Sequence, residues 1–211
     1  MDTDMILYSG NDMVKLGCGE CSGCSSCCRG MGQSIVLDPY DIYQLQTATG
    51  MNFAQLMQES VELHVEDGLI LPSLKMQDRT ESCGFLSAEG RCDIHTHRPG
   101  LCRLFPLGRH YDESGLHYFL LEDACLVQNR TKVKIRKWLG ISALPQYERF
   151  LIVWHDLRKH IQEEIAERQS DAYTQKINVR ILEVFYQTPY DTAEDFYAQF
   201  EKRQKGFQTD I

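Results

Sequence analysis

The feature that most constrains this chain is a run of five cysteines within eleven residues. The run is interleaved with Gly and Ser and has no apolar periodicity, so it fits neither a buried helix face nor a buried strand. The chain has nine cysteines, an odd number, and two of the five are adjacent, which is a poor framework for disulfides. A chain of 211 residues can also bury a core without cross-links. We therefore interpret the run as metal ligands: Cys18, Cys21, Cys24, Cys27 and Cys28.

The spacing of the run is that of bacterial ferredoxins, C-x2-C-x2-C-x3-C, with one cysteine added. The added residue is Cys27, and Arg29 stands where ferredoxins have proline. Thiolates this close together in a glycine-containing turn can converge on one metal or on one face of a cluster. Neighbouring serines can donate hydrogen bonds to the sulfur atoms, namely Ser22, Ser25 and Ser26. The sequence thus predicts an iron–sulfur cluster, of the 4Fe-4S type, with zinc as the alternative.

Four further cysteines follow at wider intervals, on segments expected to form hairpins: Cys83, Cys92, Cys102 and Cys125. They complete a set of nine candidate metal ligands, although Cys125 taken alone also fits a small buried residue. Arg98 and Arg103 lie among them. Their positive charges have two alternative roles. They stabilise nearby thiolates or bind an anionic ligand, or they form ordinary ion pairs with carboxylates.

Two histidines in the same stretch are weaker ligand candidates. His95 and His97 cannot both point the same way from an extended segment, and the thiols are numerous enough to complete a site. Outside the cysteine blocks we recognise no acid, base or nucleophile constellation, so catalytic residues stay unassigned.

At these residues the sequence resembles the YkgJ-like family, a zinc- or iron-chelating domain defined by a CxxCxxCC motif. Residues 21–28 match that motif, residues 83–92 resemble the second block of the family, and residues 98–106 resemble its RP-x-x-CR-x-FP block. The resemblance covers about residues 18–130 and includes Cys125 as a late family cysteine. Two departures leave the ligand set open: Cys18 is an extra cysteine, and His95 stands where an aromatic residue is expected.

The resemblance implies metal chelation and leaves three functions open. The first is an accessory or electron-transfer protein with an iron–sulfur cluster and an unidentified protein or redox partner. The second is a cluster-dependent redox or methyl-transfer enzyme, because a flagellin lysine N-methylase is similar in its cysteine motif. The third is a structural zinc protein. We favour the first, because the chain is short and lacks a Gly-rich dinucleotide-like loop.

Charge and hydropathy narrow the choice of partner. The net charge of −8 argues against non-specific nucleic-acid binding. The chain begins without the basic segment of a signal peptide, and its longest aliphatic and aromatic run, residues 150–154, is too short to cross a bilayer. We therefore expect a cytoplasmic protein with neither a nucleic-acid nor a membrane partner.

The expected fold is α+β, with a boundary near residue 130, where the composition changes. Residues 1–130 carry 9 Lys and Arg against 18 Asp and Glu, whereas residues 131–211 carry 13 against 12. We predict a small, irregular, cysteine-rich metal-binding domain with short hairpins over 1–130, and a helical extension packing on it over 131–211.

Local signals give the elements. In the first part, Asp38 and Pro39 begin a helix that Gly50 ends, and Asn52 begins a second one. The expected extended segments are a strand at 34–37 and hairpins at 61–76, at 84–94 and around 112–115.

The second part is expected to be helical throughout. The expected helices cover 131–139, capped by Thr131, then 145–165, 172–187, and a last one through Phe200 capped by Thr192 with Asp195. Their apolar stripes fit either a partner surface or, as we prefer, ordinary core packing.

Overall fold

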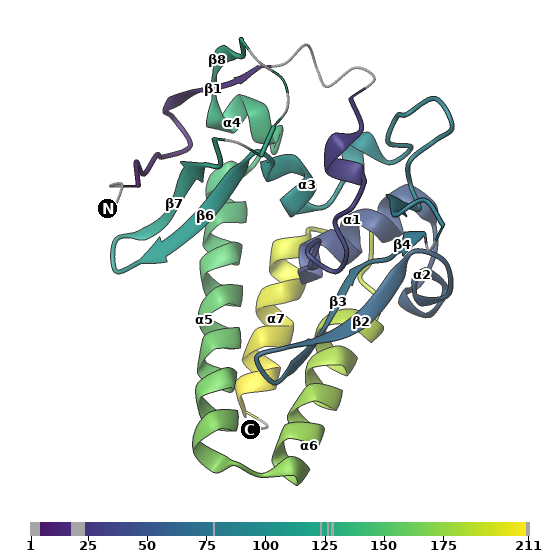
Figure 1. Ribbon diagram of the computed structural model, residues 1–211. Helices are drawn as coiled ribbons and strands as arrows, with labels where there is room; N and C mark the ends of the chain where they lie inside the picture. Colours follow the sequence, from purple (N-terminus) through teal and green to yellow (C-terminus); the bar gives the residue numbers. More distant parts are fainter. Residues whose placement is uncertain are drawn as a thin grey trace.

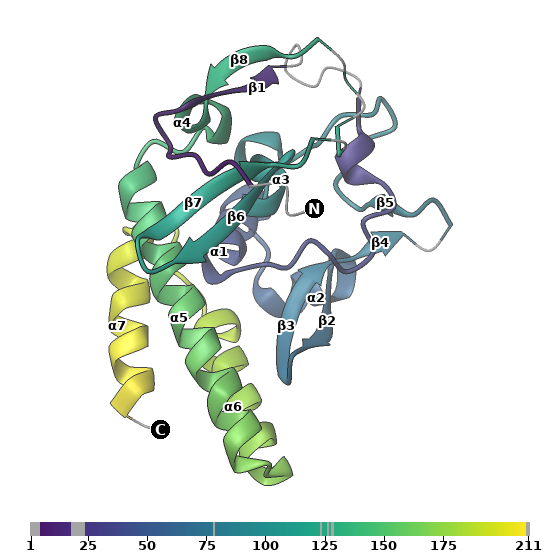
Figure 2. The same ribbon diagram turned by 60° about the vertical axis from the view of Figure 1, so that its left-hand side comes forward.

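The computed structural model of the protein describes residues 5–17, 24–77, 79–122, 124–125, 127 and 129–209. Its fold is α+β, as the sequence predicts: short helices and two-stranded antiparallel hairpins come first, and long helices follow (Figure 1). The short elements gather around one half of the long helices in both ribbon views (Figures 1 and 2). Among the described residues, none of the helices combines the length and the apolar character needed to cross a membrane.

The elements of the first part, in chain order, are β1 (Met13–Gly17), the 3-10 turn η2 (Ser26–Cys28), α1 (Pro39–Thr49), α2 (Phe53–Glu59), β2 (Val61–Glu66), β3 (Leu69–Leu74), β4 (Met76–Gln77), β5 (Ser82–Cys83), the 3-10 turn η3 (His95–His97), α3 (Gly100–Leu104), β6 (Leu107–Asp112) and β7 (Gly115–Leu120). The second part comprises β8 (Thr131–Lys134), α4 (Ile135–Leu139), α5 (Leu144–Arg168), α6 (Asp171–Leu182), the π-helical turn η4 (Glu183–Gln187) and α7 (Phe196–Thr209).

The start of α1 confirms the sequence prediction in detail. The Asp38 carboxylate accepts a hydrogen bond from the Asp41 amide at 2.9 Å, and the Asp41 carboxylate accepts one from the Asp38 amide at 3.1 Å. This reciprocal capping box satisfies two amides that a helix leaves without an internal partner. At the other end, Gly50 has a φ of 70°, a left-handed conformation that favours glycine.

Two of the three predicted hairpins are present, whereas the third hairpin and the predicted strand at 34–37 each form only one bridge. β2 and β3 pair around Asp67 and Gly68, and β6 and β7 pair with Asp112 opposite Gly115. The segment at 84–94 forms a single bridge, between Leu86 and Cys92. The segment at 34–37 likewise forms one bridge to β3 instead of a named strand.

Two helix starts were wrong. Thr131 does not cap a helix, because residues 131–134 form β8, which pairs with β1, and the helix begins only at Ile135. A tertiary partner that local propensity cannot reveal therefore decides the conformation of this segment. At the last helix, Asp195 accepts the hydrogen bond from the Ala198 amide at 2.8 Å, so Asp195 takes the capping role that we assigned to Thr192. That helix extends to Thr209 instead of ending at Phe200.

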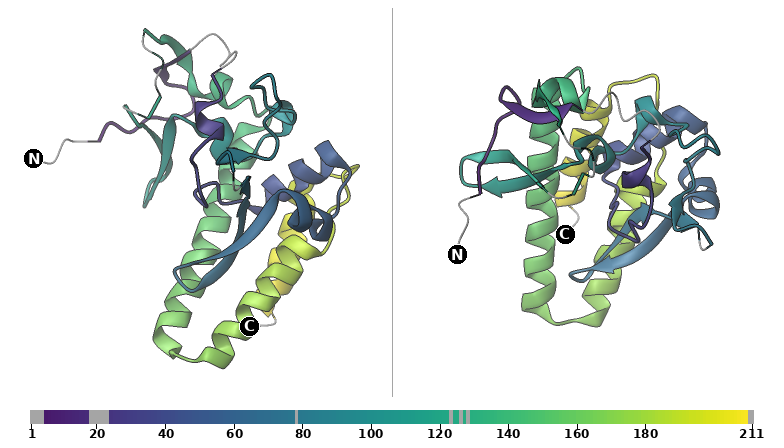
Figure 3. Two further views of the ribbon diagram at one scale, coloured as in Figure 1. Left: turned by 45° about the vertical axis from the view of Figure 1, so that its right-hand side comes forward. Right: turned by 45° about the horizontal axis from the view of Figure 1, so that its top comes forward.

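The long helices α5, α6 and α7 lie side by side (Figure 3). Buried aromatic and aliphatic side chains form the core between them. This core has the composition that the helical spacing predicts, with Trp154 at 4% exposure and Phe185 fully buried. The helices also contact the first part of the chain. The Asn178 side chain on α6 accepts from the Ile70 amide at 2.6 Å and donates to the Gly68 carbonyl at 2.9 Å.

The division into a cysteine-rich domain, 1–130, and a helical extension, 131–211, stays a proposal. The β1–β8 pair joins the two parts across that boundary.

Candidate metal centre

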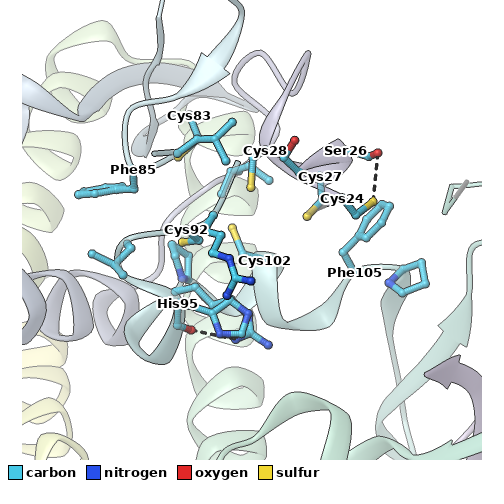
Figure 4. A pocket seen from close by; sticks show the side chains of 18 of the residues that line it. Cys24, Ser26, Cys27, Cys28, Cys83, Phe85, Cys92, His95, Cys102 and Phe105 are labelled. Carbon is cyan, nitrogen blue, oxygen red and sulfur yellow. Dashed lines mark hydrogen bonds between the residues drawn. The ribbon is translucent and has the colours of Figure 1, made fainter. Parts of the chain in front are cut away.

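A cavity of about 790 Å³ lies between segments that are far apart in the sequence. Seven cysteines line it: Cys24, Cys27, Cys28, Cys83, Cys92, Cys102 and Cys125. The first six surround one space in the close view (Figure 4). The other two predicted ligands, Cys18 and Cys21, lie outside the described residues. The fold therefore brings together the early run and the late, widely spaced cysteines.

The turn η2 presents the early cysteines. Ser25, with a φ of 37°, precedes the turn, which carries Cys27 and Cys28 as neighbours. The Gly30 amide donates to the Glu81 carbonyl at 2.7 Å, which fixes the end of the run next to β5 and its Cys83. The hydroxyl of Ser26 lies 3.4 Å from the sulfur of Cys24, so one of the predicted serine–sulfur contacts is present.

The late cysteines come from different local structures. Cys83 belongs to β5, and Cys92 lies at the bridge with Leu86. Cys102 lies in α3, a helix, and Cys125 lies outside the named strands, so the expectation that both sit on hairpins was wrong. Pro99 immediately precedes the helix, which is short because Phe105 and Pro106 follow it.

A buried carboxylate anchors α3. Asp41, only 2% exposed, accepts a hydrogen bond from the Gly100 amide at 2.7 Å. A side chain at residue 100 would overlap the Tyr147 hydroxyl and lie 2.8 Å from a guanidinium nitrogen of Arg109. Only glycine fits this close approach, so α1 fixes the start of the helix that carries Cys102. The sequence contained the signal, a capping box, but we interpreted it through Asp38 alone.

Arg103 matches neither of its two predicted roles. Its side chain is 7% exposed and donates hydrogen bonds to backbone carbonyls, at 2.9 Å to Arg98 and also to Thr96. It therefore holds the loop before α3 against the helix instead of binding a ligand or pairing with a carboxylate.

Arg98 and His95 line the cavity. The Arg98 guanidinium donates to the His95 carbonyl at 2.8 Å, and its positive charge opposes the increase that burial causes in the pKa of Cys92. His97 points elsewhere: its Nδ1 lies 2.9 Å from the Gln44 side-chain oxygen, and it is not among the residues lining the cavity. The two histidines do diverge as expected, but from a 3-10 turn instead of an extended segment.

The thiols differ in acidity. A hydrogen bond from the neighbouring Cys28 lowers the pKa of Cys27 to about 7, and the same contact raises the pKa of Cys28. Burial raises the pKa values of Cys83, Cys92 and Cys102. Most of these groups are therefore protonated thiols at neutral pH, and a metal that binds them must displace protons.

Another part of the cavity lining was not predicted. It includes Phe105, Lys137 and Trp138, and the Trp138 indole donates to the Phe105 carbonyl at 3.1 Å. Lys137 and Trp138 belong to α4, which follows β8 directly. Because the β1–β8 pairing positions this helix, no local pattern could have assigned these residues to the site.

The donor set fits a thiophilic metal, such as zinc or iron in a cluster, better than calcium or magnesium, which prefer oxygen ligands. Within the part of the chain that the structure describes, no three Cys, His, Asp or Glu side chains are grouped closely enough to hold a single ion. The described thiols are instead distributed around the cavity wall.

Comparison with known proteins gives one match. The model of the CxxCxxCC family, described as "Putative zinc- or iron-chelating domain", matches residues 20–131. This range contains all seven cysteines of the cavity wall. Neither the curated proteins nor the solved structures contain a significant match.

Proposed function

We propose that the cysteines of this chain, which belongs to the CxxCxxCC family, hold an iron–sulfur cluster of the 4Fe-4S type. In this proposal the protein acts in the cytoplasm as an accessory or electron-transfer protein with a protein or redox partner. All nine cysteines are candidate ligands, including Cys18 and Cys21.

One observation carries the proposal: seven cysteines line a cavity of about 790 Å³. A zinc ion binds four thiolates at about 2.3 Å, so its ligands converge on a point. A polynuclear cluster spreads its metal–thiolate bonds over a larger body and suits thiols that approach from several sides. The ferredoxin-like spacing and the Ser26–Cys24 contact support the same choice, because hydrogen bonds to sulfur stabilise concentrated negative charge.

Anaerobic purification followed by iron, zinc and acid-labile sulfide analysis tests the proposal. We expect iron and sulfide in comparable amounts, with broad visible absorbance and a paramagnetic resonance signal in one redox state. The Cys92→Ser and Cys102→Ser variants should each contain less iron. Stoichiometric zinc without sulfide would overturn the proposal and favour the structural zinc protein instead.

A second candidate is a cluster-dependent redox or methyl-transfer enzyme. It is favoured by His95 and Arg98, which line the cavity next to the cysteines and could contact a substrate there. The other arginine among the late cysteines, Arg103, is occupied with backbone carbonyls.

Spectra of the iron-loaded protein with and without S-adenosylmethionine separate the two candidates. A cluster closed by four cysteines has no position for an added ligand, so its spectrum should stay unchanged. A change at saturating S-adenosylmethionine that His95→Ala weakens, while iron content stays constant, would favour the enzyme.

A further inference from the structure

The acidic chain contains one strongly basic unit. Six of its 22 Lys and Arg residues, and none of its 30 Asp and Glu residues, lie in residues 13–17 and 130–137. These six are Lys15, Arg130, Lys132, Lys134, Arg136 and Lys137. The two segments form β1, β8 and the beginning of α4, which lie together at the end of the molecule opposite to the α5–α6 turn (Figure 2).

The strand register concentrates this charge on one face. Lys15 lies directly opposite Lys132, and Lys134 lies opposite Met13, so all four side chains share one side of the two-stranded ribbon. Val14 and Leu16 are buried on the other side. The three lysines are exposed, and none of them forms an ion pair with the part of the chain that the structure describes.

Like charges directly opposite each other destabilise a strand pair. Lysines on a ribbon also discourage pairing with other chains, but a mixture of Lys and Glu would do so equally well and would attract across the strands. Protection against pairing with other chains therefore does not explain why all of these charges are positive.

Basic residues also lie on α4, the helix that directly follows β8 and reaches the metal centre. Arg136 and Lys137 are exposed on α4, and Lys137 also lines the cavity with the seven cysteines. A molecule that contacts both the ribbon and α4 would therefore lie beside the candidate centre.

We propose that this basic face, formed by Lys15, Lys132, Lys134, Arg136 and Lys137, docks an acidic protein surface next to the metal centre. The inference rests on the proposed function, for which it names the class of partner. Complementary charge speeds such an encounter and orients the partner. A long nucleic acid fits less well, because the rest of the chain carries 16 Lys and Arg against 30 Asp and Glu and repels an extended polyanion.

Charge reversal with a matched control tests the inference in the full-length protein. The test variant is Lys15→Glu with Lys132→Glu. The control is Lys176→Glu with Lys202→Glu, which changes the net charge equally at exposed positions of α6 and α7. The probe is fluorescently labelled poly-L-glutamate at low salt, with duplex DNA as a competitor. We expect the wild type and the control to bind the probe with an affinity that falls with salt, and the test variant to bind roughly tenfold more weakly.

A milder variant, Lys15→Gln with Lys132→Gln, should lose about half as much binding on a logarithmic scale, and it covers the case in which charge reversal prevents folding. Equal binding by test and control variants would overturn the inference, as would duplex DNA binding more tightly than poly-L-glutamate. If the test variant binds the probe as the wild type does but associates with itself, the inference is also overturned, and the lysines serve to prevent edge-to-edge pairing of the strands. Iron and sulfide are measured on every sample, so a failure of the proposed function appears in the wild-type metal content, independently of probe binding.

Discussion

The helical tail, α5 to α7, and the cysteine region around η2 and α3 are held together in opposite ways. In the tail, large rings pack on one another: Trp154 lies 5.1 Å from Phe185 and 6.2 Å from Phe200 between ring centroids. In the cysteine region, η2 has no buried residue, and its thiols face a cavity. The tail fills its core with its own side chains, whereas the cysteine region places its cysteines around a cavity that a bound ligand would fill.

The two parts depend on each other through α1. Tyr40 on α1 packs against Phe196 and Tyr197 of α7, with ring centroids 5.1 and 5.9 Å apart. Asp41, the next residue on the same helix, holds the start of α3. Helix α1 therefore connects the tail to η3, through the contact between His97 and Gln44, and to α3 on one side of the candidate metal centre.

The largest expected effect is that of metal removal. Structural thiolate sites in zinc-finger peptides contribute about 10–16 kcal/mol, more than the net stability of most domains. Chelation should therefore remove amide protection from the loops around 24–34 and 84–98, while α5 and α6 stay protected in hydrogen-exchange experiments. Loss of protection in the tail before the cysteine region would contradict this assignment of roles.

The second-largest effect is expected from a substitution in the core of the tail. Trp154→Ala should lower the free energy of unfolding by about 3–5 kcal/mol, because it removes a buried indole from an aromatic core. Denaturant unfolding measures the change. Val179→Ala, at a side chain that is 60% exposed on α6, is the control and should change stability by no more than about 0.5 kcal/mol. Metal content per folded protein should be equal in both variants, and a lower content in Trp154→Ala alone would show that the two parts are not separable.

The third effect is expected from a substitution at Gly100, where α3 meets the side chains of Tyr147 and Arg109. Gly100→Ala should cost about 1–3 kcal/mol, because the added methyl group collides with Tyr147 and Arg109 and displaces α3. It should also lower metal affinity, because Cys102 lies two residues further on. Gly206→Ala, in α7, is the matched control. The added methyl group would have no neighbouring atom within 4 Å, so the substitution should stabilise the helix by about 0.5–1 kcal/mol. Equal stability of the two variants would show that the contact at Gly100 has no energetic importance.

The sequence was most informative where a local rule fully determines the structure. The capping of α1 by Asp38, the turn at Asp67 and Gly68, and the apolar stripe of α5 each depend on residues close together in the chain, and each was predicted. The clustering of cysteines was also evident, because few other roles suit five thiols in eleven residues.

The errors at Thr131 and Trp138 have one cause, a partner distant in the sequence, whereas the carbonyl partners of Arg103 lie close to it in the chain. Thr131 has a good helix-capping side chain, yet its segment pairs with β1 over a hundred residues earlier. Arg103 carries a charge that suggested a ligand, yet the carbonyls around it are supplied by the fold of η3 and α3. Trp138 reaches the cavity only because of the same β1–β8 pairing. Periodicity and motif spacing contain no information on such contacts.

The smallest expected effect concerns a single hydrogen bond at the cavity wall. The Ser26 hydroxyl lies 3.4 Å from the Cys24 sulfur, and once that sulfur is a metal-bound thiolate only the serine can donate. Ser26→Ala should therefore cost about 0.5–1.5 kcal/mol. A hydrogen bond to sulfur stabilises the more negative, reduced state most, so the reduction potential of the proposed iron–sulfur cluster should fall by roughly 20–60 mV, since a tenfold change for one electron is 59 mV. The control is Ser34→Ala, which loses a 2.7 Å bond to the Met31 carbonyl away from the cavity and should leave the potential unchanged in a redox titration. A potential that moves equally in both variants, or in neither, would show that Ser26 does not tune the centre, because loss of a surface hydrogen bond alone changes stability without favouring either redox state.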